Sequence, residues 1–248
     1  RLGCDERVYA KYKAIDANAL NAEQRQALKN ALRGFVLGGA ELHGEAKKRF
    51  AEIQERSAEL TQKFSENALD ATDAFAYYAS AEEMADVPDD VKAATRAAAE
   101  AEGQSGYKLT LKLPCYLPVM QFAASSALRE RLYRAYATRA SDQAEGDARR
   151  FDNTAIMQEI LALRHEEAQL LGYPDFGAVS LVPKMAESPE EVVRFLRELA
   201  AKARPYAERD VQDLRDYARK ELGLDDPQPW DWTCLLYTSP SPRDGLLS

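Results

Sequence analysis

Two adjacent residues, His165 and Glu166, come closest to a catalytic motif in this sequence. They begin the pattern His-Glu-x-x-Gln. The zinc motif His-Glu-x-x-His places two imidazoles one helical turn apart on one metal and uses the glutamate to activate water. Gln169 takes the place of the second histidine and is a poor zinc ligand, and the other histidine of the chain is His43. We therefore interpret this segment as a polar helix face.

The remaining reactive side chains show no catalytic arrangement. Gly34, Gly38 and Gly39 lack the Gly-Lys-Ser/Thr of a phosphate loop, so they indicate the C-terminal end of a helix. Acidic pairs such as Glu166-Glu167 show no apolar setting that would raise a pKa for acid–base work. Cys115 shows no adjacent base and is expected to be buried rather than reactive. We expect packing rather than a groove for four tyrosines: Tyr77, Tyr78, Tyr133 and Tyr136.

Composition indicates a globular chain and argues against several other classes. The sequence has 248 residues, 46% of them hydrophobic, which argues against disorder. Its formal net charge of −8 comes from interspersed acidic and basic residues, which disfavours nucleic-acid and acidic-membrane partners. Three scattered cysteines favour a reduced, cytoplasmic chain. The chain opens on Arg1 rather than Met, so we expect an incomplete N-terminus.

Hydrophobic periodicity predicts a mainly α-helical protein. Helices are expected over about 21–37, about 45–78, and from Pro88 to Gly103. Ser125 or Ser126 is expected to cap the next helix, and Asn153 or Thr154 the one that stops at Gly172. The Ser-Pro-Glu-Glu string at 188–191 reads as a capping box. The helix that follows it is predicted to reach Leu222, with Pro205 kinking or interrupting it.

Two segments depart from this helical pattern. Residues 107–113 alternate apolar and polar side chains and end at Pro114, which predicts one or two short β-strands. From about Thr233 the sequence is TCLLYTSPSPRDGLLS, which lacks helical periodicity. CLLYTSPSPRD is similar to the conceptual translation of a sequencing adapter. We therefore expect 1–232 to be the authentic region and 233–248 a non-native tail, with a Pro/Ser-rich linker as the alternative.

Several long strings carry a family resemblance. They are ERSAELTQKFSENALDAT (55–72), YKLTLKLPCYLPVMQFA (107–123), LRERLYRAYATRASD (128–142), ILALRHEEAQLLGY (160–173) and VSLVPKMAESPEEVVRFL (179–196). These strings resemble the thimet oligopeptidase and oligopeptidase A family of zinc metallopeptidases. The likeness extends from about residue 10 to 232, and the Pro-Trp-Asp string at 229–231 fits a point shortly before the catalytic half of that family.

The resemblance implies a helical ellipsoid divided by a deep channel that admits oligopeptides. It also implies a cytoplasmic, monomeric zinc endopeptidase that degrades short peptides, including cleaved signal peptides, without nucleic-acid or membrane partners. The family's zinc helix lies C-terminal to this sequence, and the string around His165 matches a non-catalytic helix. We thus expect an N-terminal part that supplies a channel wall and has no catalytic, cofactor-binding or metal-binding residue. Zn²⁺ would belong to the full-length enzyme and would not bind this part.

Two other interpretations remain open. A dipeptidyl carboxypeptidase shares the family fold but removes C-terminal dipeptides. A non-catalytic helical peptide-binding module would agree with the absence of a metal motif from the sequence.

Overall fold

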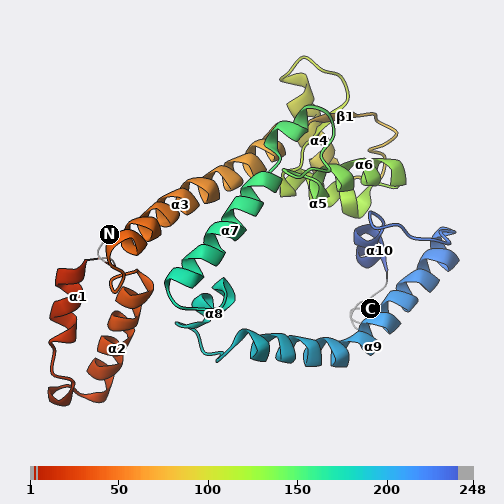
Figure 1. Ribbon diagram of the computed structural model, residues 1–248. Helices are drawn as coiled ribbons and strands as arrows, with labels where there is room; N and C mark the ends of the chain where they lie inside the picture. The colour runs from red at the N-terminus through yellow and green to blue at the C-terminus, as the bar shows by residue number, and fades with distance from the viewer. Residues whose placement is uncertain (1–2, 4, 240–248) are drawn as a thin grey trace. The chain divides into compact units, whose positions relative to one another are not determined.

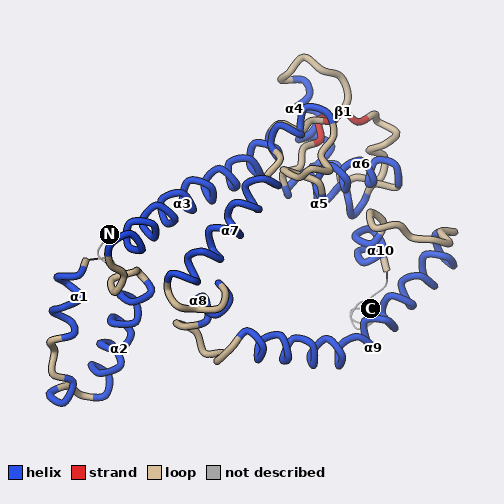
Figure 2. The backbone as a smooth tube through the Cα atoms, in the orientation of Figure 1, coloured by secondary structure: helices blue, strands red, loops and turns tan. Residues whose placement is uncertain are grey.

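The computed structural model describes residue 3 and residues 5–239 of the chain, and within them it is mainly α-helical (Figures 1 and 2). The helices are α1 (Glu6–Lys13), α2 (Ala22–Leu37), α3 (Gly44–Asp73), α4 (Asp89–Glu100), α5 (Leu113–Phe122), α6 (Ser126–Ala137), α7 (Thr154–Leu170), α8 (Phe176–Leu181), α9 (Pro189–Leu222) and α10 (Trp232–Thr238). Strands β1 (Tyr77–Ala79) and β2 (Tyr107–Leu109) form an antiparallel pair in which Tyr78 faces Lys108. Of the helices described, none has both the length and the apolar character needed to cross a bilayer.

The contacts divide the chain into two compact units. One comprises residues 1–63 and 155–200, and the other comprises residues 64–154 and 201–248. Three helices, α3, α7 and α9, run through the boundaries between these ranges. The predicted division into 1–232 and 233–248 is a different one and stays a prediction. Helix α10 covers part of the predicted tail, where periodicity gave no helix, and residues 240–248 lie outside the described residues.

In the first unit, α3 and α7 pack through their apolar stripes. Ile53 and Leu60 on α3 and Leu163 on α7 form a buried cluster. Half-buried side chains of α7 surround this cluster, namely Ile156, Ile160 and Leu170. Their spacing of three, four and seven residues keeps each set on one side of its helix. The apolar side of each helix is therefore a packing surface.

The turn after α2 requires glycine. Gly39 has φ +82°, a left-handed conformation that other residues adopt at a cost. A Cβ atom there would lie 2.8 Å from the Phe50 ring, so the close packing of α3 against this turn also excludes a side chain. The glycine pair that resembles part of a phosphate loop is thus a helix end, as predicted.

The core of the second unit lies between the two-stranded sheet and helices α4, α5 and α6. Its buried side chains are Ala79, Met84, Val87, Tyr107, Leu109, Leu111, Val119, Met120, Ala123, Leu128 and Leu132. Leu109 and Leu111 come from the alternating segment that predicted strand. Their burial explains the alternation, because every second residue enters the core.

Several predicted boundaries were wrong. The helix predicted to reach residue 78 ends at Asp73, because the aromatic pair Tyr77-Tyr78 pairs with β2 instead. The predicted strand over 107–113 ends at Leu109. Pro114 lies in the first turn of α5, where a missing N–H costs no helical hydrogen bond. The predicted helix ending at Leu222 is confirmed as α9, which continues through Pro205 without interruption.

The predicted cap of α6 is confirmed, and that of α7 differs. Ser125 accepts a hydrogen bond from the Leu128 N–H and caps α6. Helix α7 begins at Thr154, but the Asn153 side chain does not act as a simple cap. Its amide donates to the Phe64 carbonyl and its oxygen accepts from Asn67, which attaches α3 to the start of α7. Both asparagines are buried, so their polar groups need such hydrogen-bond partners.

The packing account predicts unequal costs for two leucines of α7. Leu163→Ala should lower the free energy of unfolding by about 2 to 4 kcal/mol, because it leaves a cavity beside Ile53 and Leu60. Leu161→Ala is the matched control on the same helix and should change it by about 0.5 kcal/mol or less, because Leu161 is 64% exposed. Urea unfolding followed by circular dichroism measures both. Equal losses would contradict the assigned face of α7.

Candidate functional site

The glutamate of the His165-Glu166 pair is bound to an arginine on the neighbouring helix. Nε of Arg49 on α3 lies 2.7 Å from Oε1 of Glu166, and Nη2 lies 2.8 Å from Oε2. This two-point contact with the guanidinium lowers the pKa of the Glu166 carboxyl below its usual value. Glu166 is therefore held as a carboxylate in an ion pair, which is unlike a general base aimed at a metal-bound water.

The same contact recurs seven residues along each helix. Arg56 binds Glu159 through Nε–Oε1 and Nη2–Oε2 contacts of 2.6 and 2.9 Å. Each arginine also contacts a glutamate three residues later on α3, Glu52 or Glu59, at 3.2 Å. Residue numbers rise along α3 as they fall along α7, so the two helices are antiparallel. The repeated pairs fix their register.

His165 and Gln169 have other surroundings. The His165 side chain is exposed. The side-chain amide of Gln169 donates to the carbonyls of Tyr173 and Pro174, at 3.2 and 3.0 Å. These bonds hold the segment after α7 against the last turn of the helix. Gln169 thus satisfies carbonyl groups beyond the helix rather than occupying a ligand position.

Glu167 is the acidic residue of this helix whose pKa is raised. Burial raises the pKa of its carboxyl, opposed by a hydrogen bond from Gln54 and by the charge of Arg164. A raised carboxyl pKa is one feature of a general acid. The neighbour that bonds Glu167, however, is the side-chain amide of Gln54 on α3, which is neither an acid nor a base. The arrangement supports packing rather than acid–base chemistry.

The described residues do not provide a zinc site. Nowhere in residue 3 or residues 5–239 do three His, Cys, Asp or Glu side chains gather into a metal-binding group. Nδ1 of His43 lies 3.9 Å from a carboxylate oxygen of Glu6, and both side chains are largely exposed. A catalytic zinc needs three protein ligands and an open position, and the described residues do not fit such a site.

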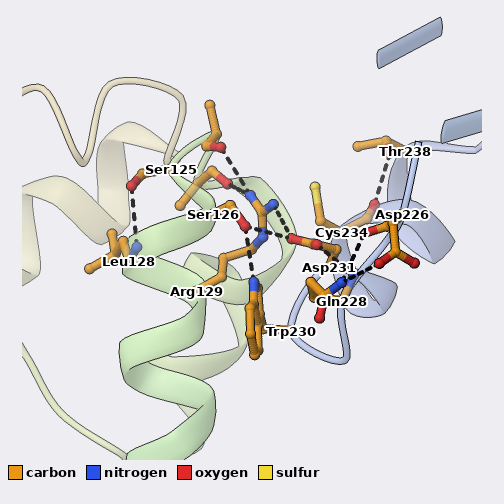
Figure 3. Close-up of polar contacts among 12 residues, drawn as sticks. Ser125, Ser126, Leu128, Arg129, Asp226, Gln228, Trp230, Asp231, Cys234 and Thr238 are labelled. Atoms are coloured by element: carbon orange, nitrogen blue, oxygen red, sulfur yellow. Dashed lines mark hydrogen bonds and ion pairs between the residues drawn. The ribbon is translucent and has the colours of Figure 1, made fainter. Parts of the chain in front are cut away.

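A buried ion pair lies in the second unit (Figure 3). Nη2 of Arg129 on α6 lies 2.6 Å from Oδ1 of Asp231, and their side chains are 7% and 2% exposed. Asp231 also accepts hydrogen bonds from the Ser126 hydroxyl, at 3.1 Å, and the Gln228 N–H, at 2.9 Å. Three donors thus stabilise the buried carboxylate.

Surrounding contacts extend this network, although Nε of Arg129 is buried without a hydrogen-bond partner. Arg129 donates to the carbonyls of Ala123 and Ala124 at the end of α5. The indole N–H of Trp230 donates to the Ser126 hydroxyl at 3.0 Å. The network therefore fixes the segment before α10 against α5 and α6. Sequence reasoning missed Arg129, because nothing local marks its pairing with a carboxylate 102 residues away.

The tyrosines pack as expected. Tyr116 and Tyr136 stack with their ring centroids 4.2 Å apart, and burial raises the pKa of Tyr116 to about 12. Tyr77 and Tyr133 also pack against the core of the second unit, while the Tyr78 hydroxyl donates to Glu102. Cys115 is only half-buried, and its Sγ accepts the Thr110 N–H at 3.4 Å. The contacts of these side chains thus support packing roles.

Comparison with known proteins decides the family. Residues 119–239 match Peptidase family M3. The chain is 46% identical over 230 residues to the oligopeptidase A of Salmonella typhimurium (strain LT2) and to that of Escherichia coli (strain K12). In each case the match covers 92% of this chain and 33% of the relative. The chain belongs to peptidase family M3.

Two further facts qualify this membership. The M3 chain spans about a third of the length of the curated relatives it matches. It is also 28% identical over 230 residues to a dipeptidyl carboxypeptidase of Escherichia coli (strain K12), covering 91% of this chain and 33% of that relative. Relatives with both names therefore match this chain, and the oligopeptidases A are the more similar to it.

The buried network predicts a large asymmetry among the arginines of α6. Arg129→Met should lower the free energy of unfolding by about 3 to 5 kcal/mol, because Asp231 would remain buried without its cation. Arg134→Met, the control, should cost about 1 kcal/mol or less, because its pair with Glu130 is largely exposed. Urea unfolding of the two variants measures this difference. The double variant Arg129→Met/Asp231→Leu should recover much of the loss, and a cost as large as that of Arg129→Met would contradict the explanation.

Proposed function

We propose that this chain is part of an oligopeptidase A-like zinc metalloendopeptidase that hydrolyses short peptides, including remnants of signal peptides. The observation that carries the proposal is the 46% identity to oligopeptidase A over 92% of the chain. We place the enzyme in the cytoplasm as a monomer whose substrates are oligopeptides, with no nucleic-acid or membrane partner. The described part would form a wall of the peptide channel.

We further propose that the catalytic residues and the zinc lie outside this chain. The contacts of the His165-Glu166 helix support this division of roles, because Glu166 binds Arg49 and Gln169 binds backbone carbonyls. By this account the chain alone carries no catalytic or metal-binding residue and hydrolyses no peptide. When bound in the complete enzyme, zinc would supply an activated water and polarise the peptide carbonyl.

A chimera tests the proposal. Residues 1–232 replace the segment of the Escherichia coli oligopeptidase A that they match, and the substrate is an internally quenched peptide blocked at both ends. The chimera is expected to hold one zinc ion and to cut an internal bond, with activity lost on chelation. The isolated chain is expected to show neither zinc at stoichiometric amounts nor hydrolysis.

His165→Ala in the chimera is the matched control, and zinc content and activity should not change. Metal analysis and mass spectrometry of the products distinguish the outcomes. Release of C-terminal dipeptides only from peptides with a free carboxyl end would favour the dipeptidyl carboxypeptidase interpretation, which the relative at 28% identity supports. A folded chimera with zinc that cuts no peptide would contradict the enzyme proposal and favour a non-catalytic peptide-binding module.

A further inference from the structure

Residues that precede the predicted tail fix where helix α10 begins. Asp231 comes directly before α10, and its buried carboxylate binds Arg129 and Ser126 of α6. The Asp231 side chain makes no capping bond to α10 itself. The neighbouring Trp230 is held by the same Ser126 hydroxyl. All these residues precede Thr233, where the predicted tail begins. Whatever polypeptide follows Asp231 therefore starts at this place in the second unit.

From that starting point α10 packs against α5, within the same compact unit. Leu235 is only 1% exposed, and the Tyr237 ring lies edge-on to Phe122 of α5 with the ring centroids 4.7 Å apart. A helix of seven residues gains little from its own hydrogen bonds, so this packing is what supports it. We name the surface of α5 around Phe122, together with the Arg129 side chain, the α10 seat.

The predicted tail fits the α10 seat imperfectly. Nε of Arg129 is buried without a hydrogen-bond partner, in the same guanidinium that binds Asp231. A buried donor is normally paired, because an unpaired one has lost its bond to water and gained nothing in return. Helix α10 also ends at Thr238, and Pro240 follows in the sequence, a residue without the N–H that a continuing helix needs. These two features indicate a seat that was shaped by another segment.

We propose that the α10 seat receives the segment that follows Asp231 in the complete enzyme, as a helix with an apolar side chain at the position of Leu235. The proposal rests on the proposed function and on the prediction that residues 233–248 are non-native. The match to Peptidase family M3 extends to residue 239, so the family has polypeptide at the position of α10. Burial of the apolar side chain supplies the attraction, and the Arg129–Asp231 pair fixes where the helix begins.

Exchanging the tail tests the proposal. Residues 233–248 are replaced by an equal number of residues that follow the aligned position in the Escherichia coli oligopeptidase A. The urea midpoint of unfolding should rise by about 0.5 M, because the new segment fits the seat better.

Aspartate at position 235 of the exchanged chain should remove this gain, and aspartate at position 236 is the matched control and should retain it. In the original chain, Leu235→Asp should likewise lower the midpoint more than Leu236→Asp, because the two side chains are 1% and 66% exposed. An unchanged or lower midpoint after the exchange would contradict the proposal, and so would a gain that survives aspartate at position 235.

The chimera described above gives a second measurement if the exchanged chain does not fold. Amide hydrogen exchange of the residues after Asp231 should be slow in the chimera, because docking makes exchange depend on a larger opening. Phe122→Asp should remove this protection, and Leu117→Asp, at an exposed position of the same helix, should retain it. Fast exchange in the unsubstituted chimera would contradict the proposal.

The gene sequence and the activity of the chimera separate the remaining outcomes. An authentic gene that encodes Thr-Cys-Leu-Leu-Tyr-Thr-Ser after Trp232 would overturn the proposal, because α10 would then be the native occupant of the seat. Peptide hydrolysis is scored separately. An active chimera with an unprotected segment after Asp231 refutes the seat while sparing the proposed function, and a protected segment in an inactive chimera does the reverse.

Discussion

The antiparallel pairing of α3 with α7 is the constraint on which the first unit depends. Neither helix can bury its apolar stripe alone, and Ile53, Leu60 and Leu163 become buried only where the two meet. Apolar contacts of this kind do not by themselves set a register, because neighbouring turns offer similar surfaces. The Arg49–Glu166 and Arg56–Glu159 pairs, one seven-residue step apart, set it. Exposed ion pairs contribute little free energy, yet their geometry selects one alignment.

This constraint also explains the motif that looked catalytic. Glu166 is an acid at the position where α7 faces Arg49, and Gln169 is an amide at the position where the next turn must satisfy two carbonyls. The similarity to a zinc motif arises because a packed helix also repeats polar residues at intervals of three and four positions. Membership of peptidase family M3 therefore rests on long sequence identity and not on His165.

Local chemistry determined how much of the fold could be predicted. Ser125 caps α6, and α9 ends at Leu222 before Gly223, because caps and stops act within a few residues. The end of α3 was missed, because the choice between helix and strand at Tyr77 depends on pairing with Leu109. The Arg129–Asp231 pair could not be found, because no periodicity relates residues 102 positions apart. For the candidate site, the sequence sufficed to reject a zinc site at Gln169, but the partners of Glu166 required the structure.

Charge reversal at the Arg49–Glu166 pair tests the central claim most directly, that α7 is a packing helix held in one register against α3. The measurement is the urea midpoint of unfolding for Arg49→Glu, Glu166→Arg and the double variant. The account predicts that each single reversal lowers the midpoint, because like charges then face each other, and that the double reversal restores most of the loss. A double variant that loses as much as the two single variants combined would contradict the pairing.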